Sequence, residues 1–84
     1  MTDADPIESL MNLGPVSSRS LRDIGILTIG DLRRVGSVEA YVMLKMHGKN
    51  FNTVMLWAME MGLQGRHWQS ITPAEKRSLK AGIS

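Results

Sequence analysis

The residues best suited to bind a ligand lie in a Gly-Pro turn at positions 12–15 and shortly after it. Glycine lets backbone N–H groups approach a phosphate closely, and the asparagine that starts the turn tolerates a positive φ. A helix beginning after the turn would add the positive end of its dipole, a serine hydroxyl and two arginines one turn apart. We therefore predict weak phosphate binding here. The predicted contact residues are Asn12, Leu13, Gly14, Ser17, Arg19 and Arg22.

Two helices that flank such a turn form a helix-hairpin-helix unit, which grips the phosphates of DNA without reading its bases. Two residues weigh against a DNA contact in this chain. Val16 stands where DNA-binding units of this kind often carry Lys or Arg, and Asp23 offsets part of the arginine charge. A hairpin that serves only as a compact structural corner therefore stays open as an alternative.

If the hairpin is structural, the rest of the basic body becomes the candidate binding surface. Three of the eight acidic residues precede position 14, so positions 14–84 hold all ten Lys and Arg residues against five Asp and Glu. This balance suits a polyanion or an acidic protein partner, and equally a solvated surface. The alternative partner-binding residues are Arg33, Arg34, Lys45 and Lys49.

Catalytic and metal sites are not expected. Most carboxylates fall where a helix cap or an exposed helix face explains them, whereas acid/base catalysis needs a pocketed carboxylate with a shifted pKa. The histidines, His47 and His67, are twenty residues apart, the chain has no cysteine, and neither histidine has a neighbour at metal-ligand spacing. The sequence thus predicts no enzyme, no metal, no cofactor and no small-molecule substrate.

Composition predicts one small domain over residues 1–84 with an acidic lead over residues 1–5. The chain is 43% apolar and 21% charged, which is ordinary for a soluble globular protein. Its start is acidic without an apolar signal segment, and no apolar run approaches a membrane span. With no cysteine, these features lead us to expect a cytoplasmic protein without a membrane partner.

Glycines that end helices and N-cap residues that begin them predict where the helices lie in the sequence. Asp5 is expected to cap the first helix, Ser37 the fourth, and Thr72 the last in a capping box with Glu75. Helices this short are marginal alone and must be stabilised by packing. The expected fold is a compact all-α bundle of five to six short helices with a helix-hairpin-helix-like N-terminal half. The predicted helices span residues 6–11, 15–24, 28–35, 37–47, 52–64 and 72–81.

The segment 52–64 is apolar almost all the way round, so we place it at the centre of the bundle. Trp57 and most methionines are expected in the core, although methionine-rich faces can also bind partners. Trp68 is expected to pin the loop before the last helix onto the body. The inner face of the fourth helix is predicted to carry Val38, Tyr41, Val42 and Met46.

The order LGPVSSRSLRDIGILTIGDLRRVGSVEAYVMLK, followed by LWAMEMGLQGRHW, resembles the C-terminal domain of the TfoX/Sxy family of competence regulators. The resemblance covers about residues 10–80. It implies an all-α, helix-hairpin-helix-like domain and a link to transcriptional control of DNA uptake genes. Longer family members carry a separate N-terminal domain before this one, which we do not expect in this chain.

From the residues and the resemblance together, we expect a non-enzymatic bacterial regulatory or accessory module that contacts DNA weakly and without sequence preference. The alternative is a protein-interaction module that docks on a transcription factor or RNA polymerase, with a purely structural hairpin.

Overall fold

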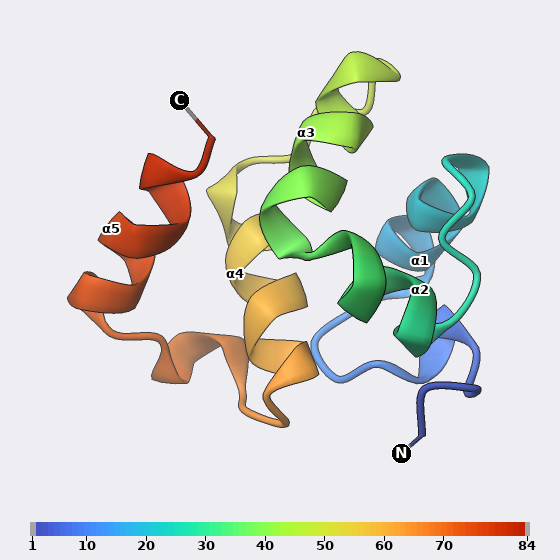
Figure 1. Cartoon of the computed structure of the whole chain (residues 1–84), viewed down its shortest axis with the longest axis horizontal. Coiled ribbons are helices and arrows are strands. Elements are labelled where there is room, and N and C mark those ends of the chain that lie inside the picture. Colours follow the sequence, from blue (N-terminus) through green and yellow to red (C-terminus); the bar gives the residue numbers. More distant parts are fainter. Residues whose placement is uncertain (1, 84) are drawn as a thin grey trace.

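Helices make up the regular structure of residues 2–83, which is the part of the chain that the computed structural model describes. Two 3₁₀ turns, η1 (Ile7–Ser9) and η2 (Trp68–Ser70), precede α1 and α5 (Figure 1). The all-α prediction is confirmed, and no helix in the described part could cross a membrane. The α-helices are α1 (Pro15–Asp23), α2 (Ile29–Val35), α3 (Ser37–Met46), α4 (Thr53–Leu63) and α5 (Pro73–Ala81).

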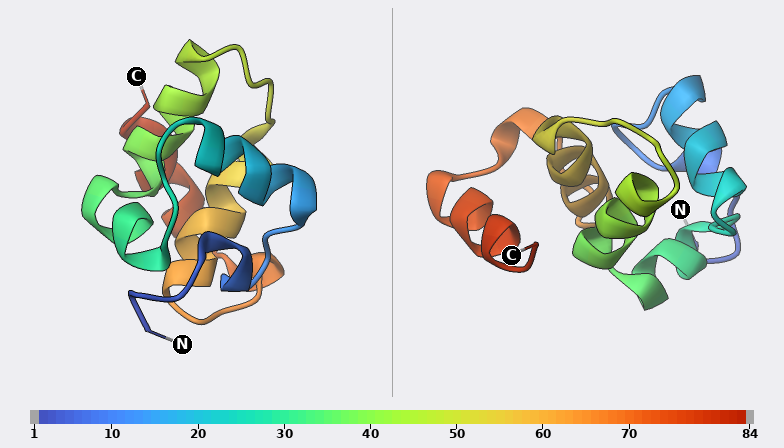
Figure 2. Two further views of the ribbon diagram at one scale, coloured as in Figure 1. Left: turned by 90° about the vertical axis from the view of Figure 1, so that its right-hand side faces the viewer. Right: turned by 90° about the horizontal axis from the view of Figure 1, so that it is seen from above.

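Helix α4 lies at the centre of the bundle, as its apolar sequence predicts. Leu56, Met59 and Met61 on this helix are fully buried, and Trp57 is 5% exposed. Helix α3 packs against α4, and α1, α2 and the N-terminal segment lie to one side while α5 lies to the other (Figures 1 and 2). Trp68 packs partly buried against the core, which confirms its predicted position.

The N-terminal lead is bound to the start of α2. The amides of Gly30, Ile29 and Ile7 donate to the carbonyls of Asp3, Asp5 and Leu27, at 2.8, 3.0 and 2.9 Å. A Cβ at position 30 would lie 2.9 Å from the Asp3 carbonyl oxygen, so glycine permits this close approach. The acidic lead is therefore packed against the body.

The predicted helix over residues 6–11 is wrong, because only the three-residue turn η1 forms there. Asp5 does not cap it; its carboxylate accepts the Thr2 amide at 2.9 Å. The backbone on both sides of Pro6 is already paired with residues 27–29, and a segment this short gains little from its own helical bonds. The chain therefore enters the α1 turn from extended backbone and one 3₁₀ turn.

Helix α3 differs from its predicted cap and from part of its predicted inner face, since Tyr41 is buried and Val38 packs against the core as expected but Met46 does not. Gly36 occupies the N-cap position, and Ser37 is buried, with its hydroxyl donating to Glu60 Oε1 at 2.8 Å. The buried residues are Ser37, Ala40, Tyr41 and Leu44, which follow helical spacing, whereas Met46 is 78% exposed. The predicted capping box at Thr72 is present, and Thr28 caps α2 in a second capping box with Asp31.

Helix α5 has no fully buried residue, and it is attached by the partly buried Leu79, which packs against the core, and by polar contacts at its start. The Arg66 guanidinium, in the loop after α4, binds the Glu75 carboxylate, with Nη1 lying 2.7 Å from Oε2. Another nitrogen of Arg66, Nη2, donates to the Ser70 carbonyl at 2.8 Å. Arg66 thus joins the end of α4, η2 and the first turn of α5.

We expect acid to weaken this junction. The hydrogen bond from Arg66 and the Thr72 amide lower the pKa of Glu75 from 4.5 to about 2. Because the pKa is depressed in the folded state, the stabilisation is complete above the ordinary value and is lost as pH falls toward the folded value. Between pH 6 and pH 2, the melting temperature of the parent should fall more steeply with decreasing pH than that of Glu75→Gln. Parallel curves would contradict this role of Glu75.

Candidate functional site

The turn before α1 is held in shape by Asn12. Its φ is +77°, a left-handed conformation that asparagine tolerates. Its side-chain amide donates to the carbonyls of Arg66 at 2.9 Å and Ala58 at 3.3 Å, and its Oδ1 accepts the Trp68 backbone N–H at 3.2 Å. The Asn12 side chain therefore ties the turn to α4 and η2, and it positions the candidate site rather than facing a ligand.

The same turn lies directly against α4. A Cβ at Gly62 would come within 2.6 Å of the Met11 carbonyl oxygen and 3.0 Å of Leu10 Cγ. Leu13 is partly buried and packs against the core. Because its backbone packs against α4 and the Asn12 side chain makes three hydrogen bonds, the turn is preorganised in the absence of a ligand.

The start of α1 is open to solvent. Gly14 is its N-cap and is exposed, and a Cβ added there would meet nothing within 4 Å. Pro15 at the first helical position brings no N–H, while the N–H groups of Gly14, Val16 and Ser17 have no acceptor among the described residues. Three donors near the positive end of the helix dipole are therefore left without a partner in the described chain.

The two arginines of α1 differ in availability. Arg22 Nη2 lies 2.7 Å from Glu8 Oε1, and this hydrogen bond lowers the pKa of Glu8. Arg19 is exposed and makes no ion pair with the described residues. The structure thus brings Arg19, but not Arg22, to the turn as an uncommitted positive charge.

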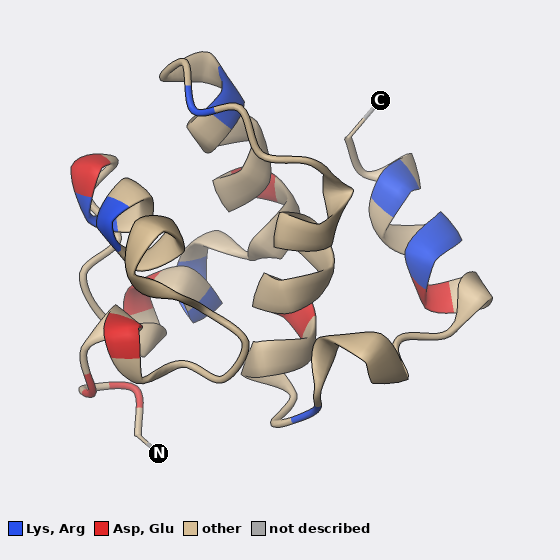
Figure 3. Ribbon diagram, turned by 180° about the vertical axis from the view of Figure 1, so that it is seen from behind, with Lys and Arg blue, Asp and Glu red and all other residues tan. Residues whose placement is uncertain are grey.

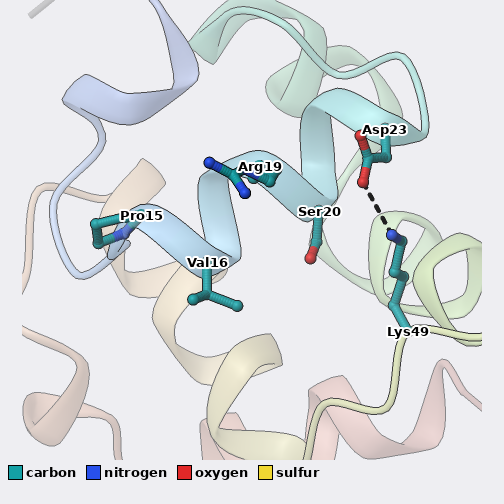
Figure 4. Close-up of a pocket in the computed structure, with 6 residues that line it drawn as sticks. All are labelled: Pro15, Val16, Arg19, Ser20, Asp23 and Lys49. Carbon is teal, nitrogen blue, oxygen red and sulfur yellow. Dashed lines mark hydrogen bonds and ion pairs between the residues drawn. The ribbon is translucent and has the colours of Figure 1, made fainter.

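A shallow groove of about 240 Å³ runs along the exposed face of α1 (Figure 4). Pro15, Val16 and Arg19 line it, and Val16 is 71% exposed. The ion pair between Lys49 Nζ and Asp23 Oδ2, at 2.9 Å, lies at the far end of the groove from Pro15. The groove therefore has the exposed Arg19 near Pro15 and Val16, and a neutralised ion pair at its other end.

The four alternative partner-binding residues each have a contact within the chain. Arg33 pairs with Asp3 at 3.0 Å, Arg34 with Asp31, and Lys49 with Asp23. Lys45 Nζ lies 5.1 Å from the centre of the Tyr41 ring. The pairings of Arg33 and Lys49 join residues far apart in the chain and cannot be seen in the sequence, whereas the partners of Arg34 and Lys45 lie one helical turn away.

Sequence reasoning missed a cluster of cations on α5. Lys76, Arg77 and Lys80 are exposed and make no ion pair with the described residues. Figure 3 shows basic segments in blue along α5, the helix nearest the C-terminus, and an acidic segment in red at its start. The sequence contained a signal for this cluster, because the three residues lie one to four positions apart on a helix whose start is marked by a capping box. Elsewhere, no group of three or more potential metal ligands occurs within residues 2–83.

Comparison with known proteins identifies relatives across nearly the whole chain. The family model of the TfoX C-terminal domain matches residues 3–83. The DNA transformation protein TfoX of Haemophilus influenzae is 32% identical over 73 residues, which are 87% of this chain and 34% of that protein. The chain thus spans about a third of that relative.

Two crystal structures from Listeria monocytogenes share the fold. An uncharacterized protein in a triclinic form is 32% identical, with a TM-score of 0.82 over 89% of this chain and 85% of that one. A protein of unknown function in a tetragonal form is also 32% identical, with a TM-score of 0.82 over 90% of this chain and 94% of that one.

Proposed function

Because this chain belongs to the TfoX C-terminal domain family, we propose that it is a non-enzymatic regulatory or accessory module whose α1 start contacts DNA phosphates. The Haemophilus relative is named as a DNA transformation protein, which supports a role connected with DNA uptake. The role proposed here concerns only the third of that protein that this chain spans. The contact is weak and independent of base sequence.

The observation that carries the proposal is the open start of α1. The unpaired N–H groups of Gly14, Val16 and Ser17 lie together at the positive end of a helix, where anions bind favourably. The exposed Arg19 follows within the first turn and a half, and adds a full positive charge. The rigid turn held by Asn12 keeps these donors in place, which reduces the ordering cost of binding.

The same geometry limits the affinity. Arg22 is held by Glu8, Val16 contributes no charge, and the groove ends at a neutral ion pair. With Arg22 held by Glu8, Arg19 is the uncommitted cation of α1, and one neutralised phosphate gives a slope of about −1 in a plot of log affinity against log salt. Dissociation constants of roughly 10⁻⁴ to 10⁻⁶ M near physiological salt are typical of such non-specific contacts.

Charge substitutions on and away from α1 test this proposal. Arg19→Glu should weaken binding to unrelated duplexes about equally, as measured by fluorescence anisotropy at several salt concentrations, because phosphate contacts carry no direct sequence information. Arg77→Glu on α5 makes the same change in net charge and is the matched control. Glu8→Gln releases Arg22 and should strengthen binding, steepening the salt slope by about 1.

Two results would overturn the proposal. Equal losses from Arg19→Glu and Arg77→Glu would show a general charge attraction without a site at α1. An unchanged affinity in Arg19→Glu would remove the arginine from the contact altogether.

A further inference from the structure

A second groove, of about 320 Å³, lies between α3, the start of α4 and the end of α5. Tyr41, Thr53 and Ile83 form its wall, and Lys45 and Lys80 stand on its rim. The Tyr41 hydroxyl already donates to the Phe51 carbonyl at 3.0 Å, so this residue offers the groove its apolar ring. A groove of this size is at the lower end of the roughly 300–1,000 Å³ range of ligand pockets and suits a small anchor.

The rim of this groove carries uncompensated positive charge. Lys45 lies over the Tyr41 ring without a carboxylate partner, and Lys80 makes no ion pair with the described residues. Lys76, one turn before Lys80 on α5, is also exposed and unpaired. By contrast, Arg22 and Arg66 are matched to carboxylates in the chain. No carboxylate among the described residues forms an ion pair with these lysines, so the rim can attract an acidic partner.

We propose that this groove docks an acidic segment of a partner protein, with a large apolar side chain of that segment inserted between Lys45 and Lys80. The apolar wall recognises the anchor, and the lysines recognise carboxylates on either side of it. A nucleic acid matches the charge but brings no apolar side chain for the wall. The groove lies apart from the α1 start, so this docking does not depend on the DNA contact.

A pair of end-capped peptides tests the docking. One peptide carries a single leucine flanked on both sides by glutamates, and the other carries serine in place of leucine. In amide NMR titrations at low salt, the leucine peptide should shift the signals of Tyr41, Lys45, Thr53, Lys80 and Ile83. The serine peptide should bind severalfold more weakly. Added salt should weaken both peptides, because the charges on the rim are exposed.

A charge-matched pair of double variants locates the surface. Lys45→Glu with Lys80→Glu should lower affinity for the leucine peptide about tenfold, since two attractions become repulsions. Arg19→Glu with Arg77→Glu changes net charge equally, uses exposed and unpaired residues outside the groove, and should retain most of the binding. All four positions are exposed, so amide spectra should show that both variants fold.

Three results would overturn the docking proposal. These are an equal loss of affinity for the leucine peptide in the two double variants, equal affinity of the parent for the two peptides, or amide shifts centred on residues outside the groove. The Arg19 control also separates the two proposals. It should weaken DNA binding while sparing the peptide, and the Lys45 and Lys80 variant should keep the amide shifts that DNA causes at α1.

Discussion

Trp57→Ala is expected to destabilise the fold by about 3–5 kcal/mol, the range for truncating a large buried aromatic residue. Trp57 is 5% exposed on the central helix, between Leu56 and Met59 in the core cluster. Small domains have total stabilities of about 5–15 kcal/mol, so this variant should lose a large part of its stability. Urea denaturation followed by far-UV circular dichroism measures the change without depending on tryptophan fluorescence.

Met46→Ala provides the control for this prediction. Met46 is apolar and lies on the neighbouring helix α3, but it is 78% exposed, so its truncation should change stability by no more than about 0.5 kcal/mol. A Trp57→Ala protein with the same urea midpoint as the parent would contradict the central position of α4.

Asn12→Ala is expected to cost about 2–4 kcal/mol, because two carbonyls and one N–H lose their partner and because alanine is strained at positive φ. Asn12→Gly loses the same hydrogen bonds but adopts this φ freely, so it should be less destabilised than Asn12→Ala. Asn12→Asp keeps the acceptor for Trp68 and loses both donors. Chemical denaturation of the three variants measures the contributions.

The order of stability of these variants separates the hydrogen bonds of Asn12 from its backbone conformation. If glycine and alanine were equally destabilising, backbone conformation would contribute nothing and the hydrogen bonds would account for the whole effect. If all three variants matched the parent, the turn would not depend on Asn12, and the rigid positioning of the α1 start would be contradicted.

Local signals predict most of the helical bundle. The capping boxes at Thr28 and Thr72 place the starts of α2 and α5, and Asn52 and Gln64 bound α4 as expected. These features are encoded by residues three or four apart, so the sequence alone reveals them. The positive φ of Asn12 belongs to the same class, because its turn is a local feature.

The predictions that the structure contradicts concern residues whose conformation depends on contacts with distant segments of the chain. Residues 6–11 form only a 3₁₀ turn because the neighbouring backbone pairs with residues 27–30. Ser37 faces inward because Glu60 accepts its hydroxyl hydrogen bond. On α3 nearly every residue is apolar or small, so periodicity could not distinguish the buried Leu44 from the exposed Met46.

In the candidate site, too, local features can be predicted from the sequence and long-range contacts cannot. The sequence indicates the turn, the helix start and the arginines, whereas the commitment of Arg22 to Glu8 depends on two residues fourteen positions apart. The three hydrogen bonds of Asn12 reach partners 46 to 56 positions away. Which cations stay free for a partner is therefore a property of the folded chain.

The contact between the α1 start and DNA is tested most directly by amide NMR during titration with a short duplex at low salt. The proposed function predicts that the largest shifts fall on Gly14, Val16 and Ser17, whose N–H groups have no acceptor in the described chain. These shifts should shrink in Arg19→Glu and persist in Arg77→Glu. An absence of shifts from Leu13 to Arg22, or shifts centred on α5 instead, would contradict the proposal.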